Sequence, residues 1–261
     1  SLEWLGEYRV PVILLTATLT SSRRNEFLAA YAGRKAKDIN ITGVSYPRVS
    51  CATRVGNVES MPLKCDVPRM QVEIIPITDD DSVQKVLSAA TAAGACAGVI
   101  VNSVARAQAF SVVGRSVGGN PVVLYHSQFV APDRIIREKE VLAVAGKDAA
   151  LEIRQESITA GTQVLEQSLN LNFDVLVVDI CPIDLLLQRI GREFRYLDTI
   201  RPDGYKSPRC YVLCSEEAIR IASRIYGEWP IRQTLKILSR FREGGCICLP
   251  DDISDLVEEA Y

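Results

Sequence analysis

The sequence lacks several residues and segments on which whole classes of function depend. Its 261 residues include one histidine, His126. Zinc sites are built from clustered cysteine and histidine ligands, so the pairs Cys210 with Cys214 and Cys246 with Cys248 lack the partners of a zinc site. No apolar run approaches the ~20 residues that a membrane-spanning helix needs. We therefore expect no metal site in this chain and no membrane partner.

An excess of charge of either sign is also missing, which limits the partners that composition supports. The chain has 30 basic and 32 acidic residues, a net charge of −2, so it does not attract nucleic acid as a whole. The segment 188–209 is an exception, with six basic and three acidic side chains. Any polyanion is expected to meet that segment. The acidic end, 251–259, is interpreted as a solvated helix, with a partner-facing surface as the alternative.

Cysteine is not scarce, but its context argues against disulfides. The eight cysteines accompany no secretory signal at the start of the sequence, and disulfides are rare in the reducing cytosol. We expect a cytoplasmic protein whose cysteines are reduced and act as packing residues.

Apolar runs and helical patterns alternate through the middle of the chain. Strands are expected at 71–75, 98–101, 122–125, 152–158, 175–178 and 210–214, and helices at 80–93, 103–113, 132–144, 182–196 and 216–225. Strands that alternate with helices of about ten or more residues indicate a parallel sheet covered by helices on both faces. The expected fold is therefore α/β, from position 71 to about 226.

The two ends of the chain follow other patterns. The run 10–15 is apolar without alternation and predicts a strand buried on both faces, followed by a helix at 21–31. The polar turn between them, Thr16-Ala17-Thr18, would lie at the ligand-binding edge of a parallel sheet. The alternative is that Thr18, Thr20 or Ser21 only caps the helix. The segment 36–66 has no helical period and is predicted to be a linker. The end, 229–261, is typical of two helices around a Gly244-Gly245 break.

The predicted helix at 182–196 has an unusual polar face. At 100° per residue, Gln188, Gly191, Arg192 and Arg195 lie within about a third of its circumference. A glycine inside a helix suggests that something approaches the backbone there, and guanidinium groups match phosphate oxygens. The pattern predicts a phosphate-binding face. The alternative is a solvated basic face that pairs with nearby acidic side chains.

Polar residues also follow three of the expected strands. They are Asn102-Ser103, His126-Ser127 and Thr162-Gln163. Because consecutive βα units present such turns at one sheet edge, these residues could follow a phosphate backbone. Asn102 is equally suited to cap a helix, and a lone histidine such as His126 is more often structural than catalytic.

These segments resemble the motifs of superfamily 2 helicases. The segment 188–195, QRIGREFR, resembles motif VI, Q-R-x-G-R-x-x-R; 162–170, TQVLEQSLN, resembles motif V; and Thr16-Ala17-Thr18 matches motif III. TQVLEQSLN, FDVL and CPIDLLLQRIGR together are similar to the CRISPR-associated helicase-nuclease of type I interference systems. Further similar segments are VNSVARAQ at 101–108, HSQF at 126–129, YGEW at 226–229 and LPDDI at 249–253.

The resemblance implies a RecA-like fold and a role for each matching residue. Arg192 and Arg195 would be arginine fingers at the γ-phosphate of ATP, beside Gln188 and Gly191. Asn170 would approach the ribose, where the family usually has a charged aspartate. Single-stranded DNA would be contacted by Asn102, Ser103, His126, Thr162 and Gln163. Thr16 and Thr18 would couple the nucleotide state to the grip on DNA.

Some motifs of a complete helicase-nuclease are missing from the sequence. It contains neither the phosphate loop G-x-x-x-x-G-K-[ST] nor an Asp-Glu box for Mg²⁺, and one histidine cannot build the family's His-Asp nuclease site. We therefore expect residues 1–35 to be the tail of a first RecA-like domain, 36–66 a linker, 67–228 the second RecA-like domain, and 229–261 the start of a C-terminal helical element. The first domain would provide most of the contacts to ATP and Mg²⁺.

The expected partners follow from the same resemblance. They are single-stranded DNA, the first RecA-like domain and the nuclease domain of the complete protein, and a CRISPR surveillance complex. Two alternatives stay open. The chain could be a binding module without catalysis that holds DNA or docks on the complex, or the matching half of another superfamily 2 helicase in repair or RNA remodelling.

Overall fold

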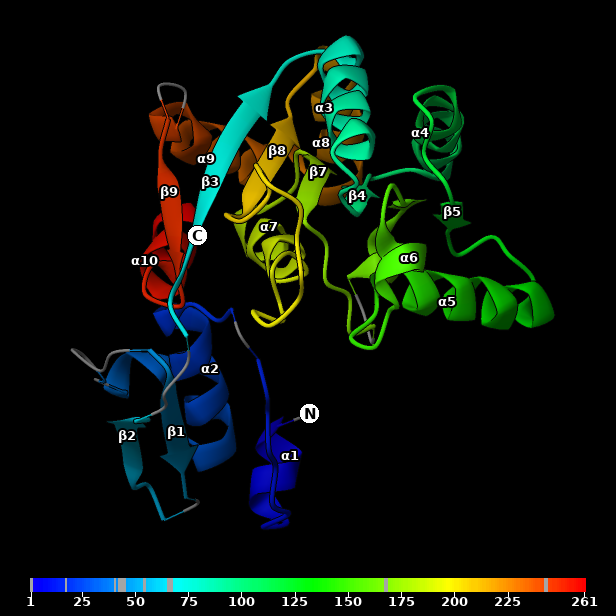
Figure 1. Cartoon of the computed structure of the whole chain (residues 1–261). Helices are drawn as coiled ribbons and strands as arrows, with labels where there is room; N and C mark the ends of the chain where they lie inside the picture. The colour runs from blue at the N-terminus through cyan, green and yellow to red at the C-terminus, as the bar shows by residue number, and fades with distance from the viewer. Residues whose placement is uncertain are drawn as a thin grey trace. The chain divides into compact units, whose positions relative to one another are not determined.

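The computed structural model describes residues 2–16, 18–39, 41, 46–53, 55–64, 68–166, 169–241 and 244–261 (Figure 1). Contacts between residues divide the chain into two compact units, a larger one formed by 71–247 and a smaller one formed by 1–70 with 248–261. The candidate site residues from Asn102 to Arg195 belong to the larger unit, whereas Thr16 and Thr18 belong to the smaller one. The assignment of residue ranges to helicase domains stays a prediction.

A seven-stranded sheet lies at the centre of the larger unit. Its strands follow the order β5 (Val122–Tyr125), β6 (Ile158–Gly161), β4 (Ala97–Ile100), β7 (Val175–Asp179), β8 (Arg209–Leu213), β3 (Met70–Ile77) and β9 (Cys246–Leu249). From β5 to β3, each neighbouring pair is parallel. Every residue of β4, β6 and β7 is buried, as in strands covered on both faces. The predicted parallel α/β sheet is confirmed.

Helices follow most of the strands and flank the sheet (Figure 1). They are α3 (Asp80–Ala92), α4 (Val104–Ser116), α5 (Ala131–Ala145), α6 (Leu151–Arg154), α7 (Ile183–Ile190), α8 (Glu216–Tyr226) and α9 (Glu228–Leu238), with 3-10 turns at Gln163–Leu165 and Ser239–Phe241. The helices predicted at 80–93, 103–113, 132–144 and 216–225 are confirmed. In the described part of the chain, no helix is long and apolar enough to cross a membrane.

The strand predicted at 152–158 is wrong in its position. The structure has the short helix α6 up to Arg154, and β6 begins only at Ile158. Arg154 is 3% exposed because it points inward to Asp174, which its Nη2 reaches at 2.5 Å. Glu156, in the turn that follows, has a left-handed φ of 59°, which breaks an extended course.

A strand that the sequence reading missed separates the two helices expected between 229 and 261. It is β9, between α9 and α10 (Ile253–Ala260). Gly244 has a φ of 93°, which glycine adopts without strain. The carbonyl of Gly245 then accepts a hydrogen bond from the Ile74 N–H at 3.0 Å, so the glycine break leads the chain alongside β3.

The smaller unit contains two strands within the predicted linker. Its elements are α1 (Leu2–Glu7), α2 (Ser21–Ala32), a 3-10 turn at Ala36–Asp38, the antiparallel strands β1 (Arg48–Ala52) and β2 (Val58–Pro62), and α10. The helix predicted at 21–31 is confirmed, with Thr20 as its N-cap. The predicted linker at 36–66 therefore contains regular structure, with Ser50 of β1 paired with Ser60 of β2.

The strand predicted at 10–15 is also wrong. Residues 10–15 have no regular structure, and Ile13 and Leu15 are 83% and 93% exposed. A strand buried on both faces needs neighbouring strands to satisfy its main chain, and none of the described strands pairs with this run.

The cysteines fulfil their predicted role only in part. Seven of the eight lie among the described residues and are free. Three are buried, as predicted, namely Cys96, Cys181 and Cys210; burial raises the pKa of Cys181 to about 12, so its thiol stays protonated. Cys51 and Cys246 are exposed, and for these two the packing prediction is wrong. Cys65 lies outside the described residues.

A buried ion cluster fixes the segment that leads into β7. The Asp174 carboxylate binds Arg154 at 2.5 Å and Arg201 at 3.1 Å, and all three side chains are at most 4% exposed. The same carboxylate accepts the Cys96 N–H at 2.9 Å, directly before β4. Charges removed from water in this way are stable only while each keeps its partner.

Asp174→Ala is expected to lower the free energy of unfolding by about 3–5 kcal/mol, because it leaves two guanidinium groups buried without their counter-charge. Asp203→Ala is the matched control, since the Asp203–Lys206 pair is exposed, and it should unfold at nearly the wild-type urea concentration. Urea unfolding followed by circular dichroism measures both. Equal losses in the two variants would contradict the stabilising role of the cluster.

Glu193 is a second buried carboxyl, with 0% exposed. Its Oε1 accepts the Arg209 N–H at 2.6 Å, which ties the end of the α7 segment to β8. Burial raises the pKa of Glu193 well above its usual range, although the Arg209 hydrogen bond opposes this. The folded state therefore holds the proton to a higher pH than the unfolded chain does. The stabilising contribution is complete below the unfolded pKa of ~4.3 and is lost as pH rises through the folded pKa.

Glu193→Gln keeps the shape of the protonated acid and cannot ionise. We expect its urea midpoint to exceed that of the wild type at pH 8 and to converge with it as the pH falls toward ~4, where the wild-type carboxyl is protonated in both states. Urea titrations across this pH range measure the difference. A difference that does not change with pH would show that Glu193 is not the titrating group.

Candidate functional site

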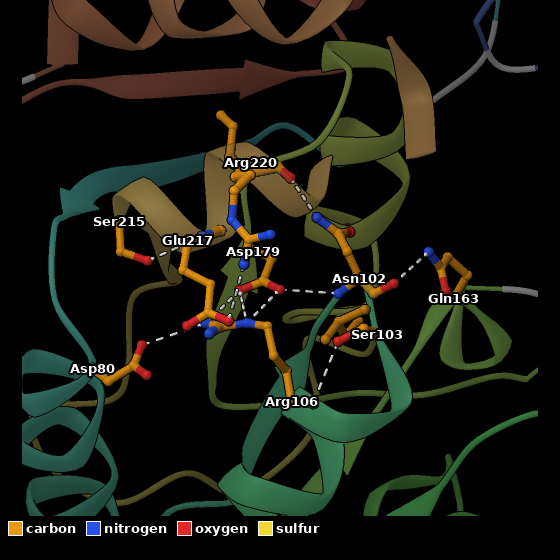
Figure 2. Close-up of polar contacts among 12 residues, drawn as sticks. Asp80, Asn102, Ser103, Arg106, Gln163, Asp179, Ser215, Glu217 and Arg220 are labelled. Atoms are coloured by element: carbon orange, nitrogen blue, oxygen red, sulfur yellow. Dashed lines mark hydrogen bonds and ion pairs between the residues drawn. The ribbon is translucent and has the colours of Figure 1, made fainter. Parts of the chain in front are cut away.

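Three strand ends meet at one edge of the parallel sheet. In the sheet register, Ile100 of β4 lies beside Gly161 of β6 and Val178 of β7. The residues that follow these strands are therefore neighbours, and Figure 2 shows Asn102, Gln163 and Asp179 gathered there. The polar strand ends come together as the sequence pattern predicts.

Asp179, the last residue of β7, holds this edge together. Its carboxylate is 0% exposed and accepts hydrogen bonds from the Asn102 N–H at 3.0 Å and from Arg106 Nε at 3.0 Å. Arg106 comes from α4 and also reaches Asp80 of α3 at 3.4 Å (Figure 2). Burial alone would lower the pKa of Arg106, but its hydrogen bonds to Asp179 together with the negative charges of Asp179 and Asp80 raise it. The Asp179 carboxylate thus joins the strand-end turn to α4, and Arg106 extends the link to the start of α3.

The Asn102 side chain is buried and forms hydrogen bonds inside the site. Only 4% of it is exposed, and its Nδ2 donates to the Ile180 carbonyl at 2.7 Å. The residue that caps α4 is Ser103, whose hydroxyl accepts the Arg106 N–H at 3.4 Å, so the N-cap interpretation of Asn102 is wrong. Ser103 itself is half-buried, so part of it is accessible to solvent.

Arg189 is the largest fully buried side chain of the unit, and the sequence reading assigned it no role. Its Nε donates to Glu166 Oε1 at 2.6 Å, its Nη1 to the Asp179 carbonyl at 2.9 Å, and its Nη2 to Asn102 Oδ1 at 2.9 Å. Burial opposes its charge, but Cys181 and Glu166 hold the pKa of Arg189 above its ordinary value. This guanidinium therefore joins α7 to the ends of β4 and β7 and to the turn after β6.

The helix of the predicted phosphate-binding face is shorter than expected. α7 ends at Ile190, and Gly191 is its C-cap with a φ of −63°. A Cβ at Gly191 would meet no atom closer than 3.4 Å, so neither close approach nor backbone strain requires glycine there. The expectation that Gln188, Gly191, Arg192 and Arg195 share one helix face is wrong, because the last three follow the helix.

Arg192 is half-buried and bound to the loop after β6. Its Nη1 donates to the Leu169 carbonyl and its Nη2 to the Glu166 carbonyl. Burial and then the positive charge of Arg195 lower the pKa of Arg192, which indicates that the two arginines are near each other. The segment 191–195 thus presents one arginine that is anchored and one, Arg195, that is exposed.

The predicted nucleotide contacts Gln188 and Asn170 are both exposed side chains. Gln188 lies on α7 one residue before the buried Arg189, and Asn170 follows Leu169, whose carbonyl Arg192 binds. Both residues therefore lie close in the chain to the arginines, and both are accessible to a ligand.

The other predicted DNA contacts are more buried than expected. His126 is 5% exposed and stacks on Phe129, with ring centroids 4.2 Å apart and an angle of 7° between the planes. Burial lowers the pKa of His126, so a neutral ring stands at that strand end. Thr162 is 4% exposed, whereas Gln163 is half-buried and bonds through its Nε2 to the Tyr226 hydroxyl at 2.8 Å.

The predicted coupling residues lie in the smaller unit. The Thr16 hydroxyl donates to the Thr18 carbonyl at 3.3 Å and accepts the Thr18 N–H at 3.2 Å. Ala17, the middle residue of the triplet, lies outside the described residues. The Thr16 hydroxyl is thus engaged with the main chain of Thr18.

Within the described ranges, no group of three or more histidine, cysteine, aspartate or glutamate side chains could hold a metal ion. Sequence reading missed five members of the site, which are Arg106, Glu166, Asp179, Arg189 and Tyr226. The signal that could have found one of them is the aspartate that ends the otherwise apolar strand VLVVD, because a carboxylate there must be paired.

Comparison with known proteins identifies the family. The model of the C-terminal part of the CRISPR-associated nuclease/helicase Cas3 matches residues 93–198. The CRISPR-associated nuclease/helicase Cas3 of Streptococcus thermophilus is 35% identical over 274 residues, an alignment that covers 100% of this chain and 28% of the relative. The chain thus spans about a third or less of this relative's length.

Solved structures of similar proteins match this chain over its whole length. The structure of T. fusca Cas3 with AMPPNP has a TM-score of 0.87 and 30% identity, covering 100% of this chain and 32% of that one. A structure described as a CRISPR RNA-guided surveillance complex, pre-nicking, has a TM-score of 0.84 and 30% identity, covering 100% and 35%. The chain belongs to the Cas3 family of CRISPR-associated nuclease/helicases, within which it corresponds to a C-terminal helicase portion with a RecA-like α/β fold.

Proposed function

We propose that this chain is the second RecA-like half of an ATP-driven translocase that moves along single-stranded DNA in CRISPR interference. The observation that carries the proposal is the pair Arg192 and Arg195 at the end of α7. Arg192 is held by the carbonyls of the loop after β6, and Arg195 beside it is exposed. Two guanidinium groups close together in the chain, one of them anchored, offer a surface that stabilises charge on a transferred phosphoryl group.

The nucleotide would lie between this half and the first RecA-like domain of the complete protein. Arg192 and Arg195 would act as fingers on its γ-phosphate, with Gln188, Gly191 and Asn170 beside them. The T. fusca relative with AMPPNP supports a nucleotide in this family. Mg²⁺ would be held by the first domain, because the described residues of this chain offer no acidic cluster for it.

Single-stranded DNA would follow the edge formed by the ends of β4 and β6. Ser103 and Gln163 are the half-buried residues there, and we propose that they touch the phosphate backbone. Asn102, Thr162 and His126 are buried, and we propose that they position the main-chain amides of the same turns. Thr16 and Thr18 would couple nucleotide state to this grip from the smaller unit.

The cellular setting of the proposal rests on relatives. A structure described as a CRISPR RNA-guided surveillance complex contains a similar chain, which supports docking of the complete protein on such a complex. A nuclease domain and a cytoplasmic location belong to the same proposal. The competing function, a binding module without catalysis, is favoured by one feature of the sequence, the lack of a phosphate loop.

Arg195→Ala in the complete protein is expected to reduce ATP turnover at least tenfold and to leave DNA affinity within about threefold, because finger arginines in related phosphoryl transfer contribute about 10³ to 10⁵ in rate. The Arg192→Ala variant should lose at least as much, since it also frees the loop after β6. Arg115→Ala, an exposed arginine at the end of α4, is the control and should turn over ATP at the wild-type rate. Near-normal turnover of both finger variants would refute the assignment.

The 261-residue chain alone is expected to show no ATP hydrolysis above background with saturating single-stranded DNA, because a second wall of the site must supply the phosphate loop. A phosphate-release assay measures this, with the complete protein as the positive control. Hydrolysis by the chain alone would overturn the view that it is half of a site. RNA that stimulates the complete protein better than DNA would favour another superfamily 2 helicase.

A further inference from the structure

The hydroxyl of Tyr226 lies where three segments of the candidate site meet. It accepts a hydrogen bond from Gln163 Nε2 at 2.8 Å and donates one to Asn102 Oδ1 at 3.3 Å. Arg189 Nη2 approaches the same oxygen at 3.5 Å. Gln163 follows β6, Asn102 follows β4, and Arg189 lies on α7, so one phenol touches both strand-end turns and the arginine helix.

The chemistry of this phenol matches its surroundings. A tyrosine hydroxyl has one donor and two acceptor positions, and the three neighbours use all of them. Burial raises the pKa of Tyr226, although the charge of Arg189 opposes the rise. The hydroxyl therefore stays protonated near neutral pH and can donate its hydrogen bond to Asn102 Oδ1.

The end of α8 gives Tyr226 a rigid position. It is the last residue of α8, and Gly227 follows with a φ of 93°, which side-chain-bearing residues rarely adopt. This turn allows α9 to begin at once at Glu228, and α9 is anchored by the buried residues Ile231 and Leu238. The phenol is thus held between two packed helices and not on a loop.

Loss of the hydroxyl would affect its three partners unequally. Arg189 keeps Glu166 at 2.6 Å and Asn102 at 2.9 Å, and Asn102 also keeps Asp179. For Gln163 Nε2, the other hydrogen bond in the described residues is a weak one, to the Asn102 carbonyl at 3.5 Å. The main effect would be to release Gln163 from the network while the buried bonds stay in place.

We propose that Tyr226 is a positioning residue that couples DNA binding at the strand-end turns to ATP turnover at the arginines after α7. The inference rests on the proposed function. DNA that contacts Gln163 displaces or fixes its amide, and the phenol passes that change to Asn102 and Arg189. Arg189 lies three residues before Arg192, and both arginines bind Glu166, one through its side chain and one through its carbonyl.

Tyr226→Phe in the complete protein tests this coupling. We measure the DNA stimulation of ATP hydrolysis, the ratio of turnover with saturating single-stranded DNA to turnover without it. We expect this ratio to fall at least threefold. A purely structural role would reduce the amount of folded enzyme and scale both rates equally, so it would leave the ratio unchanged.

Tyr211→Phe is the matched control. Tyr211 lies on β8, is half-buried, and is not one of the hydrogen-bond partners of Tyr226. The substitution also removes one phenol hydroxyl from a half-buried tyrosine, and the ratio should stay at the wild-type value. Comparison of the two variants distinguishes the effect of losing the Tyr226 hydroxyl at its position in the site from the effect of losing any tyrosine hydroxyl.

A double variant tests the path through Gln163. If both residues act through their shared hydrogen bond, Gln163→Ala combined with Tyr226→Phe lowers the ratio no further than the larger single effect. A Tyr226→Phe ratio equal to that of the wild type, or effects that add fully in the double variant, would overturn the inference. A wild-type protein whose ATP hydrolysis is not stimulated by DNA would instead overturn the proposed function, before any variant is compared.

Discussion

The buried guanidinium of Arg189 is the group on which the arrangement of the site depends. A fully buried charge is tolerated only when its donors are satisfied. Arg189 meets this condition with the Glu166 carboxylate, the Asp179 carbonyl and the Asn102 side chain, which come from three different segments. None of these segments can move far without leaving a buried donor unpaired. The parallel sheet brings them to one edge, and Arg189 fixes their distances.

The exposed part of the site follows from this buried part. Because Arg189 fixes α7, the segment after it emerges at a defined place, where Arg192 binds the carbonyls of Glu166 and Leu169. Arg195 then follows Phe194, which adopts a left-handed φ of 49°. The Phe194 ring is covered by Arg201, whose Cζ lies 3.9 Å from the ring centroid. The same loop that carries Gln163 and Glu166 therefore contacts both the strand-end edge and the arginines. This shared loop provides the physical connection between the two proposed ligand sites.

Sequence patterns predicted the parts of the fold that are governed by local periodicity. The apolar runs of β3, β4, β5, β7 and β8 and the helices between them were found because apolar runs and helical periods can be read from the sequence. The signal is clearest for β4 and β7, in which every residue is buried. The run 10–15 was misplaced because strand formation depends on partner strands that periodicity does not report. Likewise, β9 was missed because its pairing depends on the Gly244-Gly245 turn beside β3.

The sequence predicted which residues belong to the site better than it predicted how they are buried and bonded. Strand-end positions are implied by the alternation of strands and helices, so Asn102, Ser103 and Gln163 could be named. Burial of individual side chains could not be read from spacing, and His126, Thr162 and Asn102 face inward. Arg189 was overlooked because a charged residue on the apolar side of a helix is conspicuous only once its partners at positions 102, 166 and 179 are brought to it.

We propose that Arg192 and Arg195 stabilise the charge of a phosphoryl group during transfer and not merely the bound nucleotide. The direct measurement is the affinity of the complete protein, wild type and Arg195→Ala, for AMPPNP and for ADP with aluminium fluoride. Transition-state stabilisation predicts that the substitution weakens binding of the aluminium fluoride complex at least tenfold, while the AMPPNP affinity changes less than about threefold. Equal weakening of both ligands, or of neither, would contradict the account.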